Sequence, residues 1–465
     1  MGIFENQIFL RLKKKIGLER KILVAFLLVL SILYCYFATL PKYGDFWGLI
    51  LFSRGFAAGN YDVYKVIVSI FGPDAINQVQ PPAYMILEGI WIKFGAILFN
   101  WNLGINWIYA NLSSHPPEGF PIWGMIPYLF ALFLLVILTF ITVKNKWLAL
   151  IWFGPVTFVS MIIIGNSDIF VSLLIFVSLI FALKGFQEEN FFKFQLISLV
   201  FLGLSMWFKT FGGLLFPVYF LCFTYILSKK TPLFNFKFLT NVILYPLIFI
   251  GTALIIWIPY YQYFLAVNMS RASILWGSTI SIFFLNNISI WLIGFLVIIY
   301  SLFRILVYKS DTIKRIKNIF ILYVFISFSW MFMSVYTQTQ WWLILIPSII
   351  LILDYNEDIL NYILYCCFAI IYLLNPLKWA TILTPPIDFY YPVQLINKFA
   401  PTNLFVIVDS LIFSLLLIWV IDLLKNNISE ESKRILINSR FSIFLLCLPI
   451  CVLFLLLIVN KVPVA

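Results

Sequence analysis

The sequence predicts an all-α protein, a polytopic bundle of transmembrane helices. Hydrophobic residues make up 63% of the 465 residues and charged residues only 11%, and the mean hydropathy is +1.02. Apolar runs of roughly 18–25 residues recur along the chain, and runs of this length form helices that cross a bilayer. The net charge of +12 therefore marks cytoplasmic loops, and a nucleic-acid partner is not expected.

Residues 1–21 are expected to form a basic cytoplasmic segment, because they carry six Lys and Arg side chains. The first apolar run follows at about residues 22–40. It is too long for the core of a signal peptide and lacks an Ala-x-Ala cleavage site. We therefore expect a retained helix that crosses outward.

A long outer loop, residues 41–121, is expected next. It combines scattered acidic residues with several prolines, and its most apolar piece, residues 83–99, is interrupted by Glu88 and Lys93. This pattern is more typical of a helix that lies at the membrane interface than of a span. The loop is therefore expected to contain juxtamembrane helices and to make no net crossing.

Residues 122–460 are expected to form the remaining transmembrane helices. The apolar runs lie near residues 122–143, 147–164, 169–183, 194–208, 211–227, 239–258, 285–307, 318–336, 341–353, 359–376, 404–424 and 441–460. Basic residues fall in alternate loops, which places the N-terminus inside and the C-terminus outside. We expect about thirteen spans in a single integral membrane domain, residues 1–465. The six cysteines all lie inside apolar runs, so neither a disulfide framework nor a zinc site is expected.

Three ionisable residues stand out on the predicted outer face. Asp45 follows the first helix, Asp168 lies in the turn Gly165-Asn-Ser-Asp, and Lys209 stands alone between two apolar runs. A carboxylate can take a proton from a hydroxyl, and a lysine can stabilise a leaving phosphate. Each residue also has a simpler interpretation. Asp45 would be a solvated helix end, Asp168 a cap of helix N–H groups, and Lys209 a lysine whose ammonium reaches water.

Amide and aromatic side chains accompany these charges in Thr337-Gln-Thr-Gln-Trp-Trp342. They predict either an interfacial aromatic belt or a platform on which a sugar ring stacks. The chain has neither a Walker loop nor a Gly-x-Gly-x-x-Gly sequence, so a nucleotide sugar is not the expected donor.

Four sequence blocks, in order along the chain, suggest a family. The blocks are Asp45-Phe-Trp-Gly continuing to Gly59-Asn-Tyr-Asp-Val-Tyr64, then Gln80-Pro-Pro-Ala-Tyr84, then Gly165-Asn-Ser-Asp168 after Pro155, and Phe208-Lys209-Thr with Pro217. Thr339-Gln-Trp-Trp with Pro347 adds a weaker likeness. Together they resemble the GT-C glycosyltransferases, which use polyprenyl-phosphate sugars. The nearest likeness is to the catalytic subunit of GPI mannosyltransferase I and related archaeal or bacterial enzymes.

The resemblance implies an inverting hexosyltransferase (EC 2.4.1) with a GT-C-like fold. It would move a hexose, with mannose favoured, from a polyprenyl phosphate such as dolichol phosphate to a hydroxyl of a lipid-linked or glycan acceptor. It implies Asp45 as general base and Lys209 and Arg271 at the donor phosphate. The implied substrate-binding residues are Asp168, Asn166, Arg54, Tyr84, Gln338, Gln340 and Trp341.

The resemblance also implies a location and partners. The site would face outward at a cell membrane or into the lumen of the endoplasmic reticulum, among membrane lipids, with a small membrane subunit as a further partner. No cofactor is expected. Asp45 is a single acid where some members have Asp-x-Asp or Glu-Asp, which leaves a divalent-metal requirement open, and Gln80 replaces an aromatic residue.

Three other functions remain open: a secondary transporter or lipid flippase, a ligase that joins lipid-linked glycans to a carrier, and a non-catalytic scaffold subunit. Transporters place ionisable residues near the midplane, often in repeated halves. Here the polar residues lie at span ends on one predicted side, which favours the enzyme.

Overall fold

The computed structural model describes most of the chain. The described residues are 2–38, 53, 55–72, 81–101, 120–163, 165, 167–186, 191–232, 235–276, 279–282, 285–309, 312–334, 339–356, 358–373, 403–428 and 439–459.

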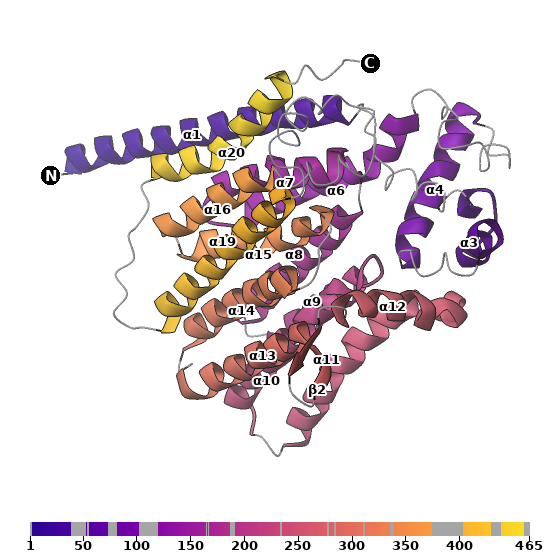
Figure 1. Cartoon of the computed structure of the whole chain (residues 1–465). Helices are drawn as coiled ribbons and strands as arrows, with labels where there is room; N and C mark the ends of the chain where they lie inside the picture. Colours follow the sequence, from indigo (N-terminus) through magenta and orange to yellow (C-terminus); the bar gives the residue numbers. More distant parts are fainter. Residues whose placement is uncertain are drawn as a thin grey trace.

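The first half of the described chain is helical (Figure 1). Its elements are α1 (Gly2–Phe37), α3 (Val63–Phe71), α4 (Pro82–Phe99), α6 (Phe120–Thr142), η2 (Lys146–Phe153), α7 (Pro155–Thr157), η3 (Phe158–Ile163), α8 (Asp168–Gly185), α9 (Phe191–Ser205), η4 (Thr210–Leu215), α10 (Phe216–Lys230) and α11 (Phe236–Ile255). The elements η2 and η4 are 3-10 helices, and η3 is a π-helix.

The second half adds one short hairpin to the helices. Its elements are η5 (Ile258–Tyr260), α12 (Tyr261–Trp276), β1 (Thr279–Ile282), β2 (Leu285–Ser289), α13 (Ile290–Lys309), α14 (Ile313–Ser334), η6 (Thr339–Leu345), α15 (Ile346–Asn356), α16 (Ile359–Tyr372), α19 (Asn403–Ile428) and α20 (Ser439–Val459). The strands pair antiparallel, with Thr279 opposite Ser289.

The predicted helical class is confirmed apart from this hairpin. Residues 285–289 were expected to begin a helix, but they form β2, and the helix starts at Ile290. The reason is local, because Thr279-Ile-Ser-Ile282 alternates apolar and polar residues with the period of a strand.

Eight helices in the described residues are long and apolar enough to cross a membrane. They cover Glu19–Phe37, Pro82–Phe99, Ile122–Thr142, Asp168–Gly185, Thr210–Lys230, Phe236–Ile255, Ile290–Tyr308 and Ile313–Ser334. Shorter apolar helices occupy Lys146–Ile162, Phe191–Ser205, Trp342–Asn356, Ile359–Tyr372 and Phe441–Leu455. This pattern indicates an integral membrane protein. The count of about thirteen spans stays a prediction.

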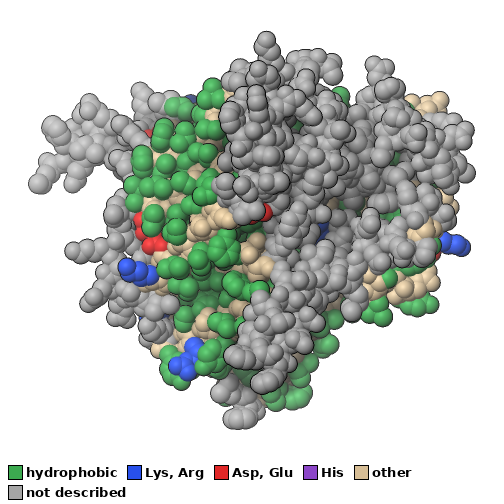
Figure 2. Space-filling view, in the orientation of Figure 1, with side chains coloured by type: hydrophobic (Ala, Val, Ile, Leu, Met, Phe, Trp, Pro, Cys, Tyr) green, Lys and Arg blue, Asp and Glu red, His purple; other side chains and the backbone are tan. Residues whose placement is uncertain are grey.

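Burial separates central from peripheral helices. The span in α14 is 83% buried and that in α8 is 67% buried, whereas those in α1, α11 and α13 are buried by 22% or less. The peripheral helices expose Leu, Ile and Phe side chains, and Figure 2 shows a described surface that is mainly apolar. Exposed apolar side chains on long helices are what contact with lipid requires.

The helix α4 combines features of a span and of an interfacial helix. Its 18 residues meet the length and apolarity of a span, whereas an interfacial helix was expected. Figure 1 shows α4 running across the direction of α1 rather than alongside it. Trp91 and Trp123 fasten α4 to α6, since their rings stack at 4.5 Å and each indole N–H donates to the carbonyl of the other residue.

Candidate functional site

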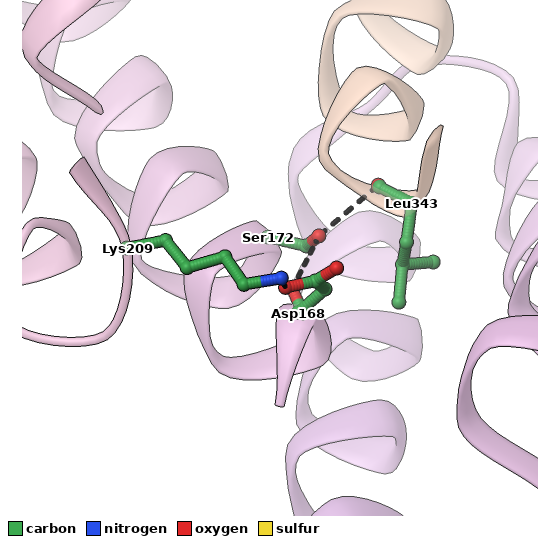
Figure 3. A network of polar contacts seen from close by, with 4 residues as sticks. All are labelled: Asp168, Ser172, Lys209 and Leu343. Carbon is green, nitrogen blue, oxygen red and sulfur yellow. Dashed lines mark hydrogen bonds and ion pairs between the residues drawn. The ribbon is translucent and has the colours of Figure 1, made fainter. Parts of the chain in front are cut away.

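A buried ion pair joins two of the predicted site residues. The Lys209 ammonium contacts the Asp168 carboxylate, and the two side chains are 1% and 0% exposed (Figure 3). The two residues are 41 positions apart in sequence: Asp168 is the first residue of α8, and Lys209 follows the end of α9. Because a buried charge is costly unless it is paired, each residue of the pair holds the other in the interior.

The turn before α8 places Asp168. Gly165 has a φ of +69°, a conformation that glycine adopts without the steric cost that a Cβ brings. Ser167 is the N-cap, and Asp168 occupies the first turn, where the helix dipole favours a negative charge. The Asp168 carboxylate forms an ion pair with Lys209. The interpretation of Asp168 as a cap of helix N–H groups stays a prediction.

The turn that follows α9 places Lys209. The Lys209 N–H donates to the Ser205 carbonyl at 3.1 Å, after which the backbone is extended and η4 begins. The Trp207 indole donates to the Thr252 carbonyl at 2.7 Å, which fixes this turn against α11. With its side chain buried, Lys209 does not reach toward water, so the interpretation as a snorkelling lysine is wrong.

Irregular helices lie around the ion pair. The π-helix η3 precedes the turn to Asp168, and the 3-10 helix η4 follows Lys209 directly. The 3-10 helix η6 contacts both η3 and α8. Ser172 joins α8 to η6, since its hydroxyl lies 2.9 Å from the Asp168 carbonyl and 3.0 Å from the Leu343 carbonyl. Such interruptions leave backbone groups for other contacts and are frequent at functional sites.

Aromatic rings extend from Lys209 toward α4. Phe208 stacks on Phe170 at 5.5 Å, and Phe170 contacts Tyr128 at 5.4 Å. The Tyr128 hydroxyl is hydrogen-bonded to the hydroxyl of Tyr84, and both tyrosines are fully buried. The predicted site residue Tyr84 is thus connected to the ion pair through ring contacts.

A fourth ionisable residue, Glu88, lies beside this tyrosine pair. It is fully buried one helical turn after Tyr84, within electrostatic reach of the Tyr84 and Tyr128 hydroxyls. In the sequence, Glu88 stands out only as an interruption of an apolar run. Glu88 follows Tyr84 by four residues, and residues at this spacing share a helix face. This spacing could have indicated from the sequence that Glu88 lies beside the predicted site residue Tyr84.

Ser53 and Phe56 pack against the same turn of α4. A Cβ at Gly89 would lie 2.7 Å from the Ser53 carbonyl oxygen and 2.8 Å from Phe56. Glycine is therefore required for this close approach. It holds Ser53 and Phe56, which belong to the first block, next to the turn that carries Glu88.

Tyr61 and Tyr64 contact the turn before α12. Tyr64 is buried against Trp257 and Tyr260, and the Tyr260 hydroxyl donates to the Tyr61 carbonyl at 2.9 Å. Burial, together with the nearby Asp62 carboxylate, raises the pKa of the Tyr260 hydroxyl. Since its ordinary pKa is already near 10, Tyr260 is a neutral donor at pH 7.

A second set of charges lies at the far end of α8. Asp354 accepts hydrogen bonds from the N–H groups of Lys144 and Asn145 at 2.7 and 3.0 Å, and Lys317 lies over the Tyr355 ring. Phe186, just after α8, contacts Phe320, one turn from Lys317. An 18-residue helix is about 27 Å long, so one bilayer thickness separates the two ends.

Several predicted site residues lie outside this description. Asp45, Arg54, Asn166 and Gln338 are not among the described residues. For Arg271, Gln340 and Trp341 the structure describes the backbone, in α12 and η6, but not the side chain. Trp342, by contrast, is buried between Phe332 and Phe368, which makes it part of the core rather than an open platform.

The described residues contain no group of three or more His, Cys, Asp or Glu side chains that could hold a metal ion. No protein-family model, curated protein or solved structure matches the chain. The function must therefore be argued from the site itself.

Proposed function

We propose that the protein is an integral-membrane glycosyltransferase that transfers a hexose from a polyprenyl-phosphate sugar to an acceptor hydroxyl. The observation that carries the proposal is the buried Asp168–Lys209 pair at one end of the bundle. In the proposal it would supply the cation that binds the phosphate of a membrane-anchored lipid. The resemblance of the four blocks to the GT-C glycosyltransferases supports the same substrate class, with mannose favoured.

In this proposal Asp168 orients Lys209 and keeps it charged. An ammonium has three N–H donors, so a lysine that binds one carboxylate can also donate to a phosphate oxygen. Away from bulk water such a charge-assisted hydrogen bond gains strength. The cation would stabilise the negative charge that develops on the polyprenyl phosphate as it leaves.

The transfer itself needs a base and a nucleophile. The acceptor hydroxyl attacks the anomeric carbon, and Asp45 takes the hydroxyl proton. The bond between the anomeric carbon and the phosphate oxygen breaks with inversion. The electron pair leaves with the polyprenyl phosphate, so charge and atoms balance without a further reactant.

The experiment is a transfer assay on purified full-length protein in lipid. Polyprenyl-phosphate mannose and polyprenyl-phosphate glucose serve as donors, with a lipid extract as the source of acceptor. We expect wild-type protein to transfer one of the sugars, and we expect Asp45→Asn and Lys209→Met to lose at least about 100-fold in rate. Full activity of Asp45→Asn would remove its role as base. Absence of transfer by wild type with all donors and extracts would overturn the proposal.

A second function is favoured by one observation. Glu88 is a buried carboxyl in an apolar helix, and intramembrane acids also mark proton-coupled transporters. The assay for this alternative is solute or lipid flux in sealed vesicles that contain the purified protein. Flux without sugar transfer would establish the transporter and exclude the enzyme.

A further inference from the structure

Glu88 has an unusual environment for an acid. Its side chain is fully buried, and in the described part of the chain neither carboxyl oxygen has a hydrogen-bond partner. The other buried acids of the described residues do have partners. Asp168 pairs with Lys209, and Asp354 accepts two backbone N–H groups.

Such a carboxyl destabilises the fold. Burial of a polar group without a hydrogen bond is unfavourable, and burial of a charge is more so. An apolar residue of similar size at position 88 would fit the apolar composition of α4 better. A residue that weakens the fold without a structural contact is expected at a functional site.

Contacts connect Glu88 to the ion pair. Tyr84 and Tyr128 lie within electrostatic reach of Glu88, and Tyr128 lies within reach of Asp168 as well. The Phe170 ring contacts Tyr128 and stacks on Phe208, the neighbour of Lys209. Pairwise contacts between buried side chains thus lead from an acid, through two phenols, to the neighbour of a cation.

This order matches the chemistry of a sugar phosphate. One glycosidic oxygen joins the sugar ring to its phosphate, so a cation that binds the phosphate must lie next to the group that binds the ring. Aromatic faces stack on sugar rings, and carboxyl oxygens accept hydrogen bonds from sugar hydroxyls.

We propose that Glu88 is a substrate-binding residue that accepts hydrogen bonds from hydroxyl groups of the transferred sugar, next to the tyrosine pair Tyr84–Tyr128. This inference rests on the proposed glycosyltransferase function and deepens it. The sugar supplies hydrogen-bond donors, which Glu88 does not find among the described residues, and this explains an acid in an apolar helix.

The test compares stability with activity in three variants of the full-length protein. Glu88→Leu removes the acceptor, Glu88→Gln keeps one carbonyl acceptor, and Gln195→Leu is the matched control. Gln195, in α9, is also fully buried, but its side chain accepts a 2.5 Å hydrogen bond from the hydroxyl of Tyr245 in α11. The measurements are the melting temperature in detergent, and kcat and KM for the polyprenyl-phosphate sugar that wild type uses.

We expect Glu88→Leu to melt at or above the wild-type temperature while kcat/KM falls at least about tenfold. Glu88→Gln should retain part of this activity. Gln195→Leu should show the opposite pattern, a lower melting temperature with unchanged kcat/KM.

A binding measurement separates the sugar from the phosphate. Polyprenyl-phosphate sugar and bare polyprenyl phosphate are each added, and the rise in melting temperature is recorded. In wild type the sugar-bearing lipid should give the larger rise, and in Glu88→Leu the two rises should be equal.

Three results are decisive. Normal kcat/KM in Glu88→Leu overturns the role of Glu88 and leaves the glycosyltransferase function intact. A lower melting temperature in Glu88→Leu, with kcat/KM unchanged for the folded fraction, shows a structural residue and overturns the role too. Wild-type protein that neither transfers sugar nor responds to either lipid overturns the proposed function and this inference together.

Discussion

At the scale of single residues, the Asp168–Lys209 pair is the feature with the clearest physical consequence. Both side chains are buried, so the pair itself contributes little net stability, because its attraction is offset by lost hydration. Removal of one partner is different, since it leaves a single buried charge. A double-mutant cycle on Asp168 and Lys209 can therefore separate the effect of the pair on protein stability from its effect on sugar transfer.

We predict that Lys209→Met alone lowers the free energy of unfolding by about 3–5 kcal/mol. The double variant Asp168→Leu with Lys209→Met should recover most of that loss, because no buried charge remains. Sugar transfer should stay abolished in both. Denaturation in detergent and the transfer assay measure the two quantities, and a double variant that regains activity would show that the pair is only structural.

Sequence reasoning could find Lys209 and Asp168 individually but not their contact. A lone lysine on a face with few basic residues is visible in the sequence. Whether that lysine turns toward water or toward an acid 41 positions earlier depends on how α8 and α9 pack. Glu88 is the reverse case: its position in an apolar run was visible, but the sequence could not show that its carboxyl has no hydrogen-bond partner among the described residues.

At the scale of elements, α4 is the helix whose placement matters most. Its buried face carries Tyr84, Glu88 and Gly89, and its opposite face exposes Ile90, Ile97 and Leu98. The Ser53 carbonyl oxygen and the Phe56 side chain approach so closely at Gly89 that no side chain fits at this position. This contact holds Ser53 and Phe56 against the turn that carries Glu88.

We predict that Gly89→Ala separates these segments. The new methyl group would overlap the Ser53 carbonyl oxygen, and backbone atoms cannot move aside as a flexible side chain can, so a loss of about 1–3 kcal/mol is expected. The rate of sugar transfer should fall together with the free energy of unfolding. The control is Ile97→Ala on the exposed face of the same helix, which should melt within a degree or two of wild type. Equal melting temperatures for both variants would contradict the close packing.

At the scale of the whole molecule, charges lie at two opposite ends. Asp168 and Lys209 lie where α8 begins, while Lys144, Lys317 and Asp354 lie toward the end where α8 finishes. The distribution of basic loops predicts that the second end faces the cytoplasm. The ion pair would then lie on the outer or lumenal side.

This orientation can be measured with a membrane-impermeant maleimide. In a chain whose native cysteines are replaced by serine or alanine, Asn60→Cys and Lys237→Cys each add one exposed thiol. In sealed right-side-out vesicles we expect Asn60→Cys to react at once and Lys237→Cys to react only after the vesicles are opened. The reverse result would place the ion pair on the cytoplasmic side and exclude a lumenal or outer donor.

The sequence by itself determined the class of protein. Within lipid, a long apolar segment satisfies its backbone hydrogen bonds mainly by forming a helix. The described residues do form such helices, together with one short hairpin. It also determined which few ionisable residues interrupt those runs, because each is costly there. Only the tertiary structure decided which of them meet. Lys209 pairs with Asp168, and Glu88 lies beside Tyr84 and Tyr128, because burial and pairing depend on contacts between helices that are distant in sequence.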